Sequence, residues 1–307
     1  MENKKYHIPV LLKTSVQYLL KNKNGIFVDL TFGGGGHSRH LLEEISENAK
    51  LIAFDQDADA QQNAIDLEKN YPNFRFIKQN FRFLQKSLQE IGITQVDGIL
   101  ADLGVSSHQF DTPERGFSFR FDARLDMRMN QTQEIDAAYV VNNYSEQELH
   151  KIFGMYGEIK NAKTLAQTIV KTRKIKTIAT TQDLKNAIAD CLPKKEINKY
   201  LAQVFQALRI EVNQELKALE EFLLQTADVL APDGRLVIIS YHSLEDRLVK
   251  NFLQKGKFYG EVEKDFYGNP IKPFELIEKL IVPTEQEIAV NPRARSAKMR
   301  VAKRVSQ

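Results

Sequence analysis

The sequence predicts an α/β fold in which a doubly wound, mostly parallel β-sheet is interrupted by an inserted α-helical domain. Three observations support this prediction. Short apolar segments alternate with helical patterns in the first third of the chain, at intervals of about 20–25 residues, which is typical of βα units. Helical patterns dominate residues 110–213, where no strand of this kind appears, and apolar β-type segments resume at residue 234. A helical insertion between the fourth and fifth strands is the simplest account of this order.

The strands of the first part are short, rich in β-branched and aromatic residues, and almost unbroken in apolar character. Parallel strands that are covered by helices on both faces have this composition. The four predicted strands are residues 26–30, 51–55, 74–78 and 96–103, and the helical patterns between them include residues 38–46 and 58–70.

Helical periods dominate the inserted segment. Its predicted helices are residues 145–153, 162–174, 181–191 and the stretch from 198 onward. A fifth strand follows at residues 234–242, and residues 274–282 and 296–305 are expected to close the sheet. The predicted domains are residues 1–109, the N-terminal part of the sheet domain, residues 110–213, the helical insert, and residues 214–307, the C-terminal part with a basic tail.

The composition is that of a folded protein that does not span a membrane, since 42% of the 307 residues are hydrophobic and 27% are charged. No apolar run approaches the roughly 18–20 residues that a membrane span needs, and the N-terminus lacks a signal-peptide pattern. The single cysteine, Cys191, cannot form an internal disulfide, so we expect a cytoplasmic protein. The net charge is only +3, but residues 291–307 carry Lys and Arg and no acid.

Four glycines, Gly33 to Gly36, follow the first predicted strand and precede a helix. Glycine lets the backbone approach a ligand closely, and the N-terminus of the following helix offers free N–H groups. Taken alone, the glycines fit a nucleotide-type cofactor and a merely tight strand-to-helix turn equally well. Asp55 favours the cofactor, because it ends the second predicted strand, where an acid accepts hydrogen bonds from ribose hydroxyls.

The acid at Asp55 disfavours a 2′-phosphate and therefore NADP, which leaves NAD, FAD or an adenosyl cofactor. The G-x-G-x-x-G turn of dinucleotide sites would need glycine at the position of Ser38, which weakens the case for NAD. The carboxylate of S-adenosylmethionine would lie against the amides of Gly35, Gly36 and His37, and its adenosine over Asp55. The His37 side chain is expected either to donate to that carboxylate or to cap and pack the helix.

Polar residues follow two further predicted strands, at the edge where open α/β sheets bind ligands. Asp102 ends the fourth strand in "ADLGVSSHQFD", where it either meets cofactor and substrate or caps a turn. The fifth strand ends in "ISYHSLEDR", whose density of polar groups core packing does not explain. The residues that it brings to the same edge are Ser240, Tyr241, His242, Ser243 and Glu245.

Together these stretches resemble the RsmH/MraW family of bacterial S-adenosylmethionine-dependent rRNA (cytosine-N4) methyltransferases. The matching stretches, in chain order, are "HIPVLL", "DLTFGGGGHS", "FDQD", "DGILADLGVSS", "ERGFSF", "LDMRM", "FQALRIEVNQEL", "ISYHSLEDR" and "NPRARSAKMR". The resemblance implies a class I methyltransferase (Rossmann-like) core, a helical insert that recognises the substrate, and S-adenosylmethionine as cofactor. The implied substrate is a cytidine in the decoding region of 16S rRNA of the small ribosomal subunit, and a homodimer stays open. The implied cofactor contacts are Gly35, Gly36, His37, Asp55, Phe81, Asp102 and Gln109.

Methyl transfer to the exocyclic N4 amine of cytosine needs hydrogen-bond acceptors, because the amine lone pair is delocalised and positive charge develops on the nitrogen. Asp102 is the predicted main catalytic group, with Ser240 and His242 as assistants. Methylation at ring carbon 5 would instead need a cysteine nucleophile, whereas Cys191 is expected to be a small apolar helix residue of the insert. No metal site is expected, because the histidines have no ligand-like spacing.

Several basic segments are candidates for phosphate contacts, namely the C-terminal run, residues 171–176 and residues 192–199. Solvated surfaces unrelated to RNA explain each of them at least equally well. In "RGFSFRFDARLDMRM", residues 115–129, aromatic and arginine side chains interleave, which suits both an RNA-binding surface and a packing seam. Two other classes of function stay open: a dinucleotide-dependent dehydrogenase, and an RNA-binding assembly factor without catalysis.

Overall fold

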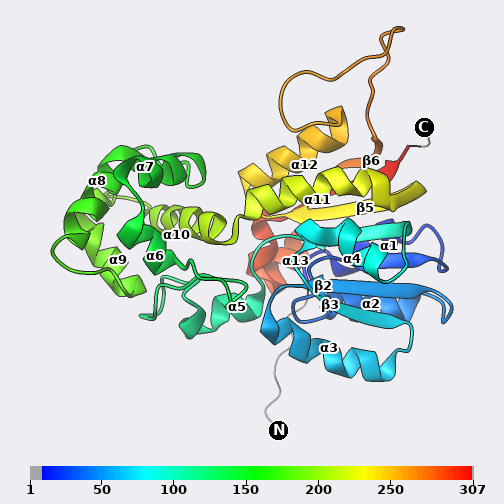
Figure 1. The fold of residues 1–307 in the computed structure, drawn as a ribbon, viewed down its shortest axis with the longest axis horizontal. Helices are drawn as coiled ribbons and strands as arrows, with labels where there is room; N and C mark the ends of the chain where they lie inside the picture. Colours follow the sequence, from blue (N-terminus) through cyan, green and yellow to red (C-terminus); the bar gives the residue numbers. More distant parts are fainter. Residues whose placement is uncertain (1–8, 306–307) are drawn as a thin grey trace. The chain divides into compact units, whose positions relative to one another are not determined.

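The computed structural model describes residues 9–305, so His7 and Ile8 of the "HIPVLL" stretch lie outside the described residues. The chain forms two compact units (Figure 1). The helical unit is Val105–Glu215, and the sheet unit combines the chain before it with the chain after it. The predicted insert, residues 110–213, is a few residues shorter than the helical unit at its two ends.

The sheet unit contains one seven-stranded sheet. Its strands are β1 (Ile26–Asp29), β2 (Lys50–Asp55), β3 (Phe74–Lys78), β4 (Val96–Asp102), β5 (Leu230–Ser240), β6 (Phe274–Ile281) and β7 (Lys298–Arg304). They lie in the order β3-β2-β1-β4-β5-β7-β6, with β1 to β5 parallel and β7 antiparallel to both of its neighbours. The order reverses between β1 and β4, and such a switch point is where open sheets bind ligands.

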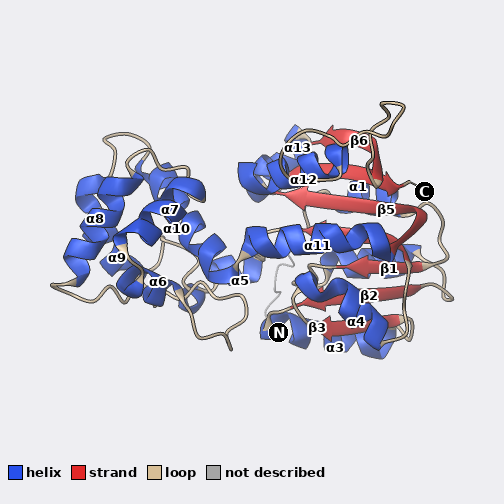
Figure 2. Ribbon diagram, turned by 45° about the horizontal axis from the view of Figure 1, so that its top comes forward, coloured by secondary structure: helices blue, strands red, loops and turns tan. Residues whose placement is uncertain are grey.

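Helices cover both faces of the sheet, which explains why its strands are nearly continuous apolar runs (Figure 2). The helices on one face, with Val28 and Phe54, are α4 (Leu84–Glu90), α11 (Glu215–Val229) and α12 (Ser243–Lys255). The helices on the other, with Phe27 and Leu51, are α1 (Leu12–Leu19), α2 (Gly36–Glu44) and α3 (Ala58–Asn70). Successive strand residues thus enter opposite cores, and the predicted doubly wound α/β fold is confirmed.

The helical unit has a core of its own. Its helices are α5 (Ser107–Asp111), α6 (Ala137–Asn143), α7 (Glu146–Met155), α8 (Ala162–Arg173), α9 (Thr181–Ala187) and α10 (Ile197–Asn213). Apolar side chains of α6 to α10 form one buried cluster, which Phe117, Leu125 and Met127 join from the long segment before α6. Capping boxes at Ser145 and Thr180 begin α7 and α9.

Two predicted elements differ from those observed by four residues at one end. The helix expected at residues 181–191 ends at Ala187, because Ile188 leaves the helical conformation, and a short 3₁₀ turn, Ala189–Cys191, follows. β5 begins at Leu230, where it pairs with Val96, and ends at Ser240 rather than at residue 242. Among the described residues, no helix is both long enough and apolar enough to cross a membrane.

Candidate active site

The glycine turn between β1 and α2 is shaped by packing at some positions and open at another. Gly33 and Gly35 have φ of 51° and 76°, in the left-handed region that favours glycine. A Cβ at Gly35 would lie 2.8 Å from the Phe32 ring, and one at Gly36 would overlap the Pro9 ring. A Cβ at Gly34 would meet no atom within 4 Å. The turn therefore has free space beside Gly34 that a bound group can occupy.

A buried hydrogen-bond network underlies this turn. The Asp29 carboxylate accepts from the Ser38 hydroxyl at 2.6 Å and from the Thr31 amide at 3.1 Å. The Thr31 hydroxyl oxygen accepts from the Asp102 amide at 2.7 Å, which joins the ends of β1 and β4. Ser38, which stands where a dinucleotide turn would have its third glycine, thus has a structural role. Sequence reasoning missed Asp29, because a polar residue in an apolar strand gives no sign of its partner.

Asp55, at the end of β2, ties the glycine turn to the neighbouring strand. Its Oδ2 accepts from the Gly33 amide at 2.8 Å, and its Oδ1 from the Asp57 amide at 2.9 Å. Burial raises the pKa of Asp55 to about 6, while these two hydrogen bonds oppose the rise. At neutral pH the group is mainly a carboxylate, and each of its oxygens keeps a lone pair that can accept a hydrogen bond from a ligand hydroxyl.

Asp102 lies at the end of β4 between the glycine turn and the end of β5. The Tyr241 hydroxyl donates to its Oδ1 at 2.7 Å, and His37 Nδ1 lies 3.9 Å from its Oδ2. Burial raises the pKa of Asp102 to about 6, and the hydrogen bond from Tyr241 opposes this rise. The Asp102 side chain is 20% exposed, so part of the carboxylate is accessible to a ligand.

The His37 ring belongs to the packing of the turn. Its Nε2 lies 3.2 Å from the Val10 carbonyl oxygen, and the residue is buried. Burial lowers the pKa of His37, so the imidazole is neutral at neutral pH. With Nε2 used in this way, the side chain is not directed at a ligand carboxylate, which leaves the His37 backbone amide for that role.

The turn after β5 is organised by Glu245. Its Oε2 accepts from the Tyr241 amide at 3.0 Å, and its Oε1 lies 3.1 Å from His242 Nε2. His242 caps α12, because its Nδ1 accepts from the Glu245 amide. The Ser240 hydroxyl donates to the Lys298 carbonyl oxygen in the neighbouring strand. Ser240 and His242 thus hold the frame of the turn, whereas Tyr241 reaches Asp102.

The last two predicted cofactor contacts lie in different units. Phe81 follows β3 in a short 3₁₀ turn, Phe81–Phe83, and its ring meets Phe222 edge-on at 5.7 Å between centroids. Gln109 lies in the helical unit, where it closes a capping box with Ser106 at the start of α5. The glycine turn, Asp55, Asp102 and Tyr241 together form the carboxyl-end site of the sheet unit.

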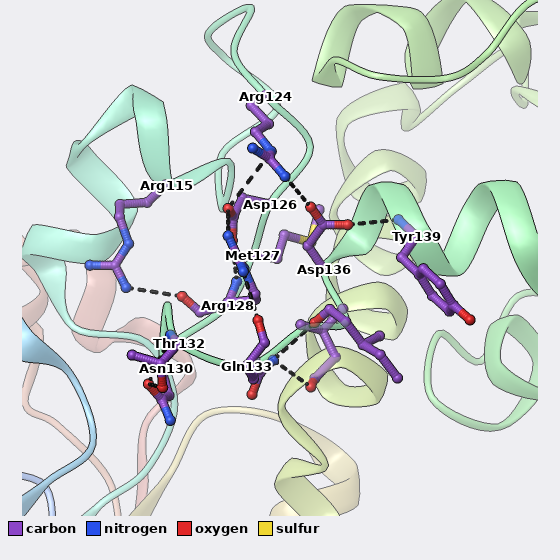
Figure 3. Close-up of polar contacts among 12 residues, drawn as sticks. Arg115, Arg124, Asp126, Met127, Arg128, Asn130, Thr132, Gln133, Asp136 and Tyr139 are labelled. Carbon is purple, nitrogen blue, oxygen red and sulfur yellow. Dashed lines mark hydrogen bonds and ion pairs between the residues drawn. The ribbon is translucent and has the colours of Figure 1, made fainter.

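The arginine-rich segment before α6 is held largely by its own polar contacts (Figure 3). Arg115 donates to the Arg128 carbonyl oxygen at 3.0 Å, and the Arg128 guanidinium pairs with both Asp126 oxygens at 2.8 and 2.7 Å. Arg124 pairs with Asp136 at 2.8 Å but remains exposed. Arg115 and Arg128 therefore support the packing alternative for this segment.

The aromatic residues of the same segment divide in the same way. Phe117 is buried in the core of the helical unit, and Phe119 packs edge-on against Phe205 at 5.6 Å. Phe121 and Arg120 are exposed, and the Arg120 guanidinium lies over the Phe110 ring. Only the outer part of the segment thus offers an aromatic and basic surface.

Many residues of the predicted basic segments have structural partners. Arg300 pairs with Asp246 at 2.8 Å, and Arg304 donates to the Ala227 carbonyl oxygen at 2.6 Å. In the helical unit, Arg173 donates to the Val141 carbonyl oxygen at 2.8 Å. These contacts favour a structural role for the three arginines.

Comparison with known proteins assigns the family. The model of the MraW methylase family matches residues 4–305. The chain belongs to the MraW methylase family. It is 58% identical over 299 residues to a Cytophaga hutchinsonii protein named ribosomal RNA small subunit methyltransferase H, covering 97% of this chain and 99% of that one. A Flavobacterium johnsoniae protein of the same name is 56% identical over 300 residues, covering 98% of each chain.

The crystal structure of an rRNA methylase from Streptococcus thermophilus aligns over 98% of this chain and 99% of that chain, with 13% identity and a TM-score of 0.43. As a member of the MraW methylase family, the present chain has the class I methyltransferase fold that the resemblance implies. Its activity is methyl transfer rather than hydride transfer. The dehydrogenase alternative is therefore set aside.

Proposed function

We propose that this MraW methylase transfers a methyl group from S-adenosylmethionine to the exocyclic N4 amine of a cytidine in the decoding region of 16S rRNA. The observation that carries the proposal is the partly accessible Asp102 carboxylate beside the glycine turn. The names of relatives more than half identical to this chain support a small-subunit rRNA substrate. The N4 position is supported by the sequence resemblance and by the acceptor chemistry of Asp102.

The carboxyl-end site fits S-adenosylmethionine in three respects. The space beside Gly34 is open, the first-turn amides of α2 are unsatisfied within the helix, and Asp55 can accept from ribose hydroxyls. The Gly35 amide already donates to the Phe32 carbonyl oxygen at 2.7 Å, so we assign the cofactor carboxylate to the amides of Gly36 and His37. When bound, this cofactor would supply an electrophilic methyl group, and its sulfur would leave with the electrons of the methyl–sulfur bond as a neutral thioether.

Asp102 has two roles in the proposed reaction. As a carboxylate it accepts an N–H bond of the target amine, which stabilises the positive charge that develops on nitrogen as the N–C bond forms. The methylated nitrogen must then lose a proton, and a carboxylate with a pKa of about 6 is suited to take it at neutral pH.

The neighbours of Asp102 act as positioning residues. Tyr241 holds one carboxylate oxygen at 2.7 Å, so the other remains for the substrate. Glu245 holds the Tyr241 backbone, and His242 and Ser240 hold the turn in which both lie. Ser240 and His242, predicted as catalytic assistants, are thus proposed to act through the position of Tyr241.

Methylation at carbon 5 has no suitable nucleophile in the sheet unit. Cys191 is the single cysteine of the chain, and it is buried in the core of the helical unit. A direct attack by the amine, assisted by Asp102, is therefore the proposed route.

The substrate class also determines the proposed partners and location. We assign substrate recognition to the helical unit, with Arg120, Phe121 and Arg124 as its exposed candidates. A small-subunit substrate implies a cytoplasmic protein. The homodimer stays a prediction, which sedimentation of the purified protein would test.

The test supplies the protein with labelled S-adenosylmethionine and small ribosomal subunits that lack the modification, and digests the RNA to nucleosides for mass analysis. We expect N4-methylcytidine. 5-Methylcytidine would contradict the proposed route, and cofactor binding without any transfer would favour the non-catalytic assembly factor.

A further inference from the structure

The chain between α12 and β6 forms a narrow finger, residues 256–273, with two aromatic side chains at its tip. Figure 1 shows it as the orange segment that extends away from the sheet unit. Its two arms are joined by an antiparallel bridge between Lys264 and Pro270, and the Ile271 amide donates to the Glu263 carbonyl oxygen at 2.7 Å. Phe266 is 98% exposed and Tyr267 is 85% exposed, more than any other large hydrophobic residue that the structure describes.

The tip is an ordered turn. Asp265 Oδ1 accepts from the amides of Tyr267 and Asn269 at 2.9 and 2.8 Å, and its Oδ2 accepts from the Asn269 side chain at 3.0 Å. Gly268 follows with φ of 86°, a conformation that glycine adopts at low cost. The two rings lie edge-to-face, 5.6 Å apart between centroids. The turn therefore presents two rings in a defined arrangement.

The base of the finger is anchored to the sheet unit. Phe258 stacks on the buried Phe252 at 5.3 Å between centroids. The Tyr259 hydroxyl donates to Glu220 at 2.8 Å, and the Asn251 side chain donates to the Phe258 carbonyl oxygen at 2.8 Å. The finger is thus joined at its base to α11 and α12.

The finger carries three lysines and three acids, so its formal net charge is zero. Lys257, Lys264 and Lys272 lie along it. Its acids are Glu261, Glu263 and Asp265, of which Asp265 is bonded to the tip amides and Glu263 pairs with Lys257 at 3.2 Å. Lys264 precedes the two exposed rings in the sequence and Lys272 follows them, and basic groups beside exposed rings suit single-stranded nucleic acid, in which bases stack and phosphates are neutralised.

We propose that the finger is a stacking contact for unpaired bases of the rRNA substrate. This inference rests on the part of the proposed function that makes the substrate an RNA. It does not depend on which atom is methylated. An apolar protein partner would be expected to bind a broad apolar patch, whereas two rings on a narrow polar finger offer flat faces to single bases. Stacking does not depend strongly on base identity, so the finger contributes affinity and position rather than selection of the target base.

The test measures the affinity of purified small ribosomal subunits for the full-length protein. It compares the wild type with three double variants at Phe266 and Tyr267. We expect Phe266→Ala/Tyr267→Ala to weaken binding about 10-fold or more. Turnover at saturating subunits, cofactor affinity and melting temperature should be unchanged. Phe266→Trp/Tyr267→Trp should restore binding, because it keeps two stacking faces, and Phe266→Leu/Tyr267→Leu should not.

The control is Leu224→Ala, an exposed apolar residue of α11 in the sheet unit, which should leave binding unchanged. Unchanged binding in the alanine pair would overturn the proposal. Full rescue by leucine would also overturn it, in favour of an apolar pocket on a protein partner. Because binding is measured directly, loss of affinity in the alanine pair would support the finger even if the methylated product were not N4-methylcytidine.

Discussion

Replacing Asp102 by asparagine should raise stability while it lowers activity. The substitution keeps the size of the side chain and an oxygen that can accept from the Tyr241 hydroxyl. It removes the charge that is costly to bury, because burial raises the pKa of Asp102 from 3.8 to about 6. It also removes the carboxylate that is proposed to accept the substrate amine and its proton.

The stability gain follows from the pKa shift. A rise of about 2 units corresponds to about 3 kcal/mol of destabilisation of the ionised native state. Because the pKa of this carboxyl is higher in the folded than in the unfolded state, its ionisation destabilises the folded protein. The cost is absent well below pH 4, where both folded and unfolded forms are protonated, and complete above pH 6. Asp102→Asn should therefore stabilise the protein by up to about 3 kcal/mol at pH 8, and by about half as much at pH 5.

The assay is thermal unfolding of wild type and Asp102→Asn at several pH values, with methyl transfer measured on the same preparations. At about 2 °C per kcal/mol, the expected rise in melting temperature at pH 8 is about 6 °C. Turnover should fall by about 100-fold or more, the usual contribution of an acid–base group. A variant that is less stable than wild type at pH 8, or whose stability difference does not depend on pH, would refute the reasoning.

Four further substitutions test the site. Tyr241→Phe removes the hydrogen bond that lowers the pKa of Asp102, so turnover measured across pH should lose more at pH 6 than at pH 8; equal losses would contradict this. Asp55→Asn should weaken S-adenosylmethionine binding in calorimetry by about 10-fold with little change in saturated turnover, the reverse of Asp102→Asn, and a matching loss in both would undo this division. Gly36→Ala should cost about 1–3 kcal/mol in thermal unfolding through overpacking, whereas Gly34→Ala should fold normally but lose cofactor affinity. Normal binding by Gly34→Ala would mean that the open space beside the turn is not the cofactor site.

Local patterns were sufficient to predict the sheet. The strand at residues 74–78 and the helix at residues 58–70 were predicted with their observed bounds, because an apolar run and a helical period are properties of neighbouring residues. The strand bounds near residue 230 were less accurate, because pairing with Val96 extends β5 beyond its apolar part. The predicted ends of β2 and β4 placed Asp55 and Asp102 at the carboxyl edge of the sheet on sequence grounds alone.

The contacts of the site residues could not be predicted, because they join distant parts of the chain. Tyr241 reaches Asp102 across 139 positions, and Ser240 reaches Lys298 across 58. The role of Glu245 did leave a signal, since a Glu three residues after a helix cap is the spacing of a capping box. The arginine segment gave no such signal, because the same residue types suit RNA binding and internal ion pairs.

The most direct test of the account is the pH dependence of a single turnover on unmodified small subunits, with protein saturated by S-adenosylmethionine. If the Asp102 carboxylate accepts the hydrogen bond and then the proton of the target amine, the rate should fall as the pH is lowered and a single group with an apparent pKa near 6 becomes protonated. The residual rate of Asp102→Asn should not show this fall. A wild-type rate that is constant between pH 5.5 and 8, or the same fall in rate in Asp102→Asn, would show that another group accepts the proton of the amine.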